Sequence, residues 1–143
     1  MKKVMNNGID EVTLARLHKE REASIARQAA APGLFLEAWK KAVKMAGASL
    51  FTCHRDYNIP SSIDAATDKW QLIPDVEAIN KYFGVASTGE ALFVAVLYSF
   101  YNSAEGQAML QNQNFKGLGD ISKRLEHDQL QIITDLMHYH TGW

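Results

Sequence analysis

Residues 87–112, STGEALFVAVLYSFYNSAEGQAMLQN, decide the fold of this chain. Between Ala91 and Tyr101 there is no charged residue, and Ser99 is the only plainly polar one. A segment that is apolar on every side belongs in the interior of a protein. It is too short to cross a bilayer, which takes about 20 such residues. We therefore expect it to be the central element around which the other segments pack.

Residue types and flanking signals predict a helix for this segment. Its aromatic and β-branched residues also suit a strand, and a run this apolar shows no clear periodicity. However, Ser87 and Glu90 have the spacing of a helix capping box, and helix-forming residues continue beyond the apolar run. We predict a buried helix over about residues 89–101, with a kink or break near residues 102–103, ahead of Gly106.

The rest of the 143-residue chain shows further helical patterns. Caps and apolar stripes recur at helical spacing, so we expect little or no sheet. The length fits one domain with a core that needs no disulfide or metal. We predict an all-α fold, a small single-domain bundle of about five or six helices. The expected elements are a flexible tail over residues 1–9, helices over about 10–30, 34–48, 75–84 and 120–140, and an irregular segment over 49–74.

The first predicted helix carries little apolar surface. Leu14, Leu17 and Ile25 lie toward one side, and mixed charges cover the remainder. Proline and glycine at positions 32 and 33 are expected to end this helix. We therefore expect the core to hold residues 10–30 only weakly, and we interpret them as an arm that protrudes from it or lies against a second copy.

Charge differs between the two parts of the chain. Residues 1–60 carry ten Lys and Arg against six Asp and Glu, whereas residues 61–143 carry five against ten. Such asymmetry can orient one protein on another. We hypothesise that residues 10–48 form most of an interface with a protein partner or a second copy, and nucleic acid is less favoured because acidic residues interrupt the basic ones. The candidate interface residues are Arg16, Arg21, Trp39, Lys40, Lys41 and Lys44.

The irregular segment holds the densest group of reactive residue types. Cys53, His54, Arg55, Asp56 and Tyr57 follow one another. A cysteine and a histidine can form a nucleophilic pair, but such partners usually come from distant parts of a sequence. Adjacent side chains point apart, so we interpret the cysteine as a half-buried structural residue.

The last predicted helix contains the residues that most resemble metal ligands. Asp135 and His138 are three positions apart, and His140 follows them. A usable site needs at least three converging ligands. His127 is roughly 16 Å from His138 along a helix, too far to share an ion with it. We interpret the two C-terminal histidines as favourable charges at a helix C-terminus.

No phosphate-binding, dinucleotide-binding or nucleophile-elbow motif occurs in the chain. We therefore favour a non-enzymatic interaction or accessory protein without a cofactor. The alternative is a metal-dependent or Cys/His hydrolase that uses Cys53, His54, Asp135, His138 and His140. A single cysteine suits a reducing compartment, so we expect a cytoplasmic bacterial protein without membrane association.

Overall fold

The predicted all-α fold is confirmed. The computed structural model describes residue 8 and residues 10–143, so the tail expected over residues 1–9 lies, apart from Gly8, outside the described residues. The described part is largely helical, with one small sheet. Its α-helices are α1 (Glu11–Ala46), α2 (Val76–Phe83), α3 (Thr88–Tyr101), α4 (Ser103–Asn112), α5 (Leu118–Arg124) and α6 (His127–Tyr139).

The segment between α1 and α2 is mostly irregular. Its two strands, β1 (Phe51–Thr52) and β2 (Ile73–Pro74), pair antiparallel, with Phe51 opposite Pro74. Two short 3₁₀-helices, η1 (Ala48–Leu50) and η2 (Lys69–Gln71), flank them. The paired strands hold together the two ends of a long loop, which is formed mainly by residues 53–68.

Helix α3 is the central element, as its sequence predicts. Every residue from Ala91 to Tyr98 is buried. The Ser87 hydroxyl caps the helix by accepting a 3.2 Å hydrogen bond from the Glu90 amide. Opposite sides of α3 enter two different hydrophobic clusters, which explains why the segment is apolar all round. One cluster takes Leu92, Phe93, Val96 and Leu97, and the other takes Val94, Ala95 and Tyr98.

The predicted break after α3 is also confirmed. Asn102 ends α3 in an extended conformation and caps α4, its side-chain oxygen accepting a 3.0 Å hydrogen bond from the Glu105 amide. Gly106 has a separate role, because a Cβ at this position would overlap the backbone of Ser99. The glycine thus allows α3 and α4 to pack closely.

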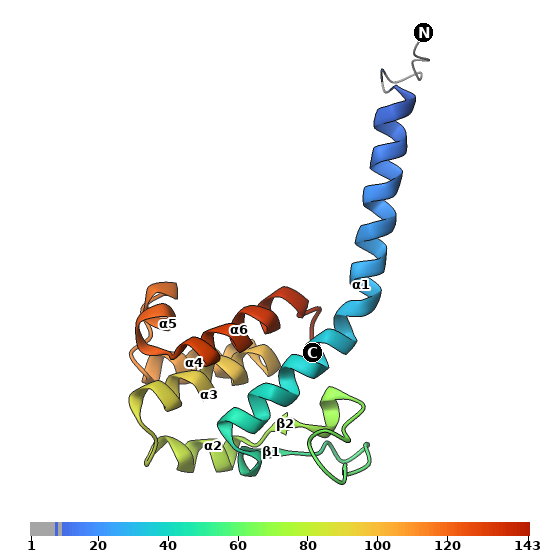
Figure 1. The fold of residues 1–143 in the computed structure, drawn as a ribbon. Helices are drawn as coiled ribbons and strands as arrows, with labels where there is room; N and C mark the ends of the chain where they lie inside the picture. Colours follow the sequence, from blue (N-terminus) through green and yellow to red (C-terminus); the bar gives the residue numbers. More distant parts are fainter. Residues whose placement is uncertain (1–7, 9) are drawn as a thin grey trace.

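The prediction that the first helix ends at residues 32–33 is wrong. Its α-helix continues through Pro32 as far as Ala46. A proline removes only one hydrogen bond and commonly bends a helix without ending it. Buried Ala31 and Phe35, which flank this position, hold the helix against the other elements. Figure 1 shows α1 changing direction at this level.

The first half of α1 projects away from the remaining helices (Figure 1). We call residues 11–30 the arm and the rest of the described domain the body. The second half of α1 packs against α6 and α3, so one helix belongs to both parts. Among the described residues, no helix combines the length and apolar character needed to span a membrane.

Candidate functional site

The arm presents its side chains to solvent over most of its length. Asp10 caps α1, its carboxylate accepting a 2.6 Å hydrogen bond from the Thr13 amide. Beyond this cap the large apolar side chains Val12, Leu17 and Ile25 are 66%, 41% and 56% exposed. Exposed apolar side chains on a projecting helix are a feature of binding surfaces.

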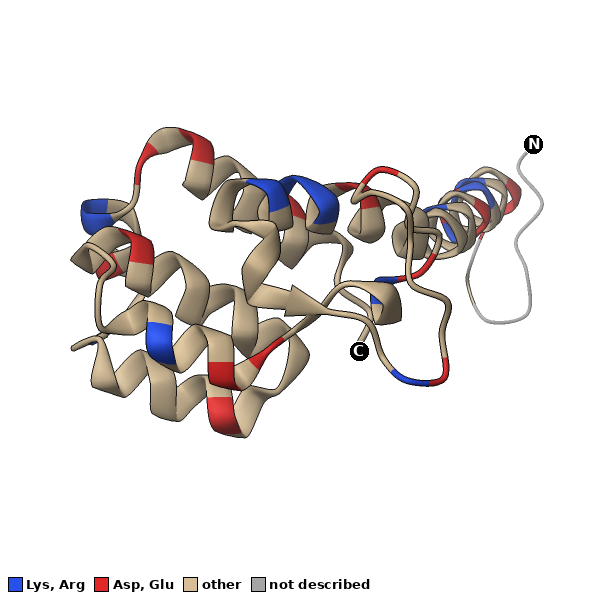
Figure 2. Ribbon diagram, turned by 90° about the horizontal axis from the view of Figure 1, so that it is seen from below, with Lys and Arg blue, Asp and Glu red and all other residues tan. Residues whose placement is uncertain are grey.

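Charges of both signs accompany these apolar residues. Arg16 and Arg21, two of the predicted interface residues, are exposed on the arm. The Arg16 Nε lies 3.9 Å from the Glu20 Oε1, one helical turn away. Figure 2 shows basic and acidic residues interspersed along the arm. The arm therefore carries exposed apolar side chains together with charges of both signs, and it has no continuous basic stripe.

Trp39 belongs to the core, which corrects its placement in an interface. Its side chain is fully buried. The indole Nε1 donates a 2.7 Å hydrogen bond to the Leu72 carbonyl oxygen, and the ring stacks on Phe35 with centroids 5.9 Å apart. A ring enclosed in this way cannot contact a partner while the domain is folded.

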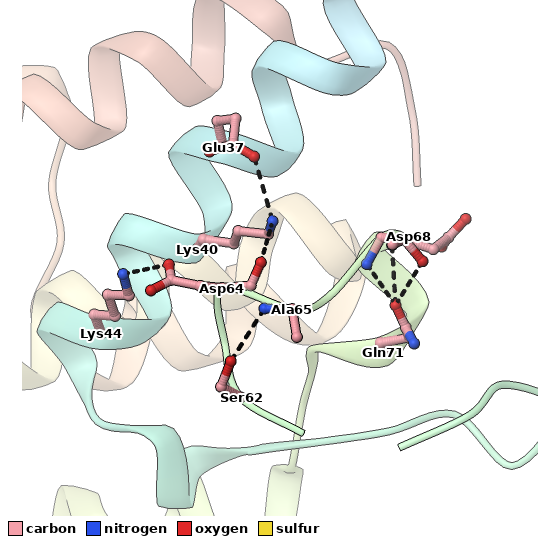
Figure 3. Close-up of polar contacts among 9 residues, drawn as sticks. Glu37, Lys40, Lys44, Ser62, Asp64, Ala65, Asp68 and Gln71 are labelled. Atoms are coloured by element: carbon pink, nitrogen blue, oxygen red, sulfur yellow. Dashed lines mark hydrogen bonds and ion pairs between the residues drawn. The ribbon is translucent and has the colours of Figure 1, made fainter. Parts of the chain in front are cut away.

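Lys40 is also buried, contrary to its predicted interface role. Its Nζ donates a 3.0 Å hydrogen bond to the Asp64 carbonyl oxygen and lies 3.3 Å from the Glu37 Oε1 (Figure 3). Lys44 Nζ lies 2.5 Å from the Asp64 Oδ1. This lysine lowers the pKa of the Asp64 carboxyl group. Together the two lysines hold the loop against α1, and Lys41 is exposed beside them.

The held loop has its own internal hydrogen bonds (Figure 3). The Ser62 hydroxyl oxygen accepts a 3.2 Å hydrogen bond from the Ala65 amide. The Gln71 Oε1 accepts a 3.1 Å hydrogen bond from the Asp68 amide, and the Asp68 carboxylate caps η2 by accepting from the Trp70 amide. These polar groups therefore stabilise the loop.

A groove lies between the base of the arm and the C-terminal end of α6. Its cavity has a volume of about 470 Å³. We call it the α1–α6 groove. Alanines at the base of the arm leave this space open, and Arg27 and His138 are polar groups in its wall. Ala30, Ala31, Leu34 and Tyr139 also line this groove.

The reactive segment predicted from the sequence lines a different cavity, of about 480 Å³. The Cys53 thiol donates to the carbonyl oxygens of His54 and Tyr57, both at 3.4 Å. The His54 Nδ1 accepts a 3.2 Å hydrogen bond from the Asp56 amide, and its ring packs edge-on against Trp70. Thiol and imidazole thus have separate partners and do not form a nucleophile–base pair in this structure.

The residues of the predicted metal chemistry also have separate surroundings. Asp135 accepts a 3.2 Å hydrogen bond from Gln131, whereas His138 lies at the α1–α6 groove. The His140 ring packs against Phe35, with centroids 5.4 Å apart. Within the described part of the chain, no three His, Cys, Asp or Glu residues are arranged to hold a metal ion.

Sequence reasoning missed the role of Trp143. Its ring packs against Trp39 and Tyr101, at centroid distances of 4.8 and 5.3 Å. The Lys69 Nζ lies 5.2 Å from the same ring and donates a 2.5 Å hydrogen bond to the Gly142 carbonyl oxygen. Burial lowers the pKa of the Lys69 ammonium group. Trp143 lies beyond the helical pattern of α6, so periodicity gave no signal for this contact.

The α1–α6 groove was missed as well. The only sequence signal for it was the group of alanines at positions 26 and 29–31, whose small side chains leave space on that part of α1.

No protein-family model, curated protein or solved structure matches this chain. Its own surfaces are therefore the basis for assigning a function. Among them, the arm and the adjoining α1–α6 groove combine exposed apolar side chains, charge and available volume.

Proposed function

We propose that this protein acts by binding another protein chain through its arm, and that it is an interaction or accessory protein and not an enzyme. The observation that carries this proposal is the exposure of Val12, Leu17 and Ile25 on a helix that projects from the body. Burial of such side chains is the main favourable contribution to protein association.

Helix stability supports a partner for the arm. Short isolated helices are marginal in water, and most helices in proteins are stabilised by packing of an amphipathic face. The arm contributes its residues to neither hydrophobic cluster of the body. Contact with another chain would supply the packing that its own body does not provide.

The charges of the arm favour protein over nucleic acid. Basic Arg16, Lys19, Arg21 and Arg27 are interspersed with acidic Glu11, Glu20 and Glu22. Protein surfaces that bind nucleic acid usually carry clustered basic residues, which neutralise the phosphates. Mixed charges instead suit recognition of a protein surface with a matching pattern.

Photo-crosslinking in cells that express the full-length protein tests this proposal. A benzophenone amino acid replaces Leu17 or Ile25 in turn, and irradiated samples are separated by mass with and without nuclease treatment. We expect nuclease-resistant adducts of discrete mass at both positions, formed with this chain or with a different protein.

Matched positions on the body provide the control. Val85 and Leu118 are 86% and 70% exposed, so a crosslinker there is at least as accessible. We expect little adduct from either. Equal yields from arm and body, or arm adducts that nuclease removes, would contradict the proposal.

A further inference from the structure

We propose that the partner of the arm is a second copy of this chain, with the two arms antiparallel and each reaching the other's α1–α6 groove. This inference rests on the proposed function and specifies the partner. It begins from a surface that runs along the arm into that groove. Residues 13, 17, 20, 24, 27 and 31 alternate in steps of four and three, so they share one face of α1.

The two ends of this face complement each other. Near the tip, Leu17 is 41% exposed and belongs to neither hydrophobic cluster of the body. At the base, Ala31 is buried and lines the groove together with Ala30 and Leu34. An apolar side chain of one helix that enters an apolar part of a groove is a common mode of recognition. The same chain therefore supplies both the inserting side chain and the space that receives it.

Charge along this face fixes the orientation of the second copy. Glu20 and Arg27 lie on it, and both are exposed. Antiparallel arms that cross between residues 23 and 24 bring Glu20 of each chain to Arg27 of the other. The same register brings Leu17 to Ala30 at the groove. Because the dimer has two-fold symmetry, each of these contacts occurs twice.

Parallel arms would lack this complementarity, because they place each residue opposite its own copy. Glu20 would then face Glu20, and Arg27 would face Arg27. Within one chain, residues 20 and 27 are about 10.5 Å apart along the helix axis, since each residue rises 1.5 Å. Within one chain Glu20 lies near Arg16, at 3.9 Å, so a Glu20–Arg27 pair can form only between chains.

Reciprocal charge exchange tests the inference on the purified full-length protein. Light scattering coupled to size exclusion measures the mass of wild type, Glu20→Arg, Arg27→Glu and the double variant over a range of concentrations. We expect wild type to approach twice 16.0 kDa. The dissociation constant of the dimer should be at least tenfold higher in each single variant than in wild type. The double variant should recover most of the wild-type affinity.

A second charge exchange controls for general effects of charge. Glu22→Arg and Arg21→Glu alter exposed residues that lie outside the shared face. We expect these variants to associate more strongly than Glu20→Arg and Arg27→Glu, and circular dichroism should confirm that all the variants stay folded.

A monomer at every concentration, or a dimer whose double variant is not restored, would overturn the inference. These outcomes are separate from failure of the proposed function. A monomeric chain that still gives discrete protein adducts from Leu17 and Ile25 in cells would have a different protein as its partner. A monomer without such adducts would contradict both.

Discussion

The indole nitrogen of Trp39 donates a 2.7 Å hydrogen bond to the carbonyl oxygen of Leu72, 33 residues further along the chain. Both residues are buried, so the carbonyl oxygen has no access to bulk water. We expect Trp39→Phe to lower the free energy of unfolding by at least about 1–3 kcal/mol, because it leaves this oxygen unpaired. Urea unfolding followed by circular dichroism measures the loss. The same change at half-buried Trp70 is the control and should cost less; an equal or larger cost there would contradict the importance of this bond.

Lys40 and Lys41 are neighbours with opposite environments. Lys40 is buried and donates to the Asp64 carbonyl oxygen, whereas Lys41 is exposed. Hydrogen bonds that involve a charged group contribute about 1.5–3 kcal/mol. We therefore expect Lys40→Met to lower the free energy of unfolding by roughly that amount. Lys41→Met should change it by less than about 0.5 kcal/mol. Similar values for the two variants in thermal unfolding would show that the lysine does not hold the loop.

Gly106 should tolerate no side chain. Alanine is favoured over glycine by about 1 kcal/mol in a helix, but a Cβ at residue 106 would overlap the Ser99 backbone. We expect Gly106→Ala to destabilise the protein by about 1–3 kcal/mol or more, as overpacking of a core does. Gly119 in α5 has open space where a Cβ would lie, and Gly119→Ala should be neutral or slightly stabilising. Chemical unfolding of both variants makes the comparison, and a stabilised Gly106→Ala protein would refute the close packing of α3 and α4.

Tyr82 should make the fold sensitive to alkaline pH. Burial, together with its 2.9 Å hydrogen bond to the Glu90 carboxylate, raises the pKa of the Tyr82 hydroxyl to about 12. The folded state thus retains this proton when an unfolded chain, with a tyrosine pKa near 10, loses it. This contribution to stability is complete below about pH 10 and is lost as the pH rises toward 12.

The pH effect can be separated from that of other groups by substitution. Unfolding midpoints in urea are compared between about pH 9 and 12 for wild type and Tyr82→Phe. All other titratable groups are the same in both proteins, so the difference isolates the tyrosine. We expect a shallower alkaline decline in Tyr82→Phe, and parallel curves would show that its ionisation is not linked to folding.

The sequence was sufficient to predict the centre of the fold. The charge-free run between Ala91 and Tyr101 predicts a buried element, and the capping box of Ser87 and Glu90 favours a helix over a strand. The Pro32 prediction failed because it used a local rule. The burial of Ala31 and Phe35 on either side stabilises the continuous helix, and that burial depends on elements distant in the sequence.

The candidate site was less accessible to sequence reasoning. Exposed Arg16 and Arg21 lie on the arm as expected, but Trp39 was assigned to the interface because lysines lie beside it in the sequence, and it is fully enclosed. The lysine pattern predicts surface charge at Lys40, because its acceptor, the Asp64 carbonyl oxygen, comes from a loop 24 residues away. The α1–α6 groove and the Trp143 contacts are likewise tertiary, so no local pattern encodes them.

Helix α1 is continuous from the arm into the body, so the arm is rigidly attached to the core. One helix carries Leu17 at its outer part and Phe35 and Trp39 inside the core, with no flexible linker between them. A partner that binds the arm therefore does not have to order a flexible linker, which would cost conformational entropy. The same helix therefore connects the arm to the aromatic rings that pack around Trp39, so we expect binding at the arm to change indole fluorescence.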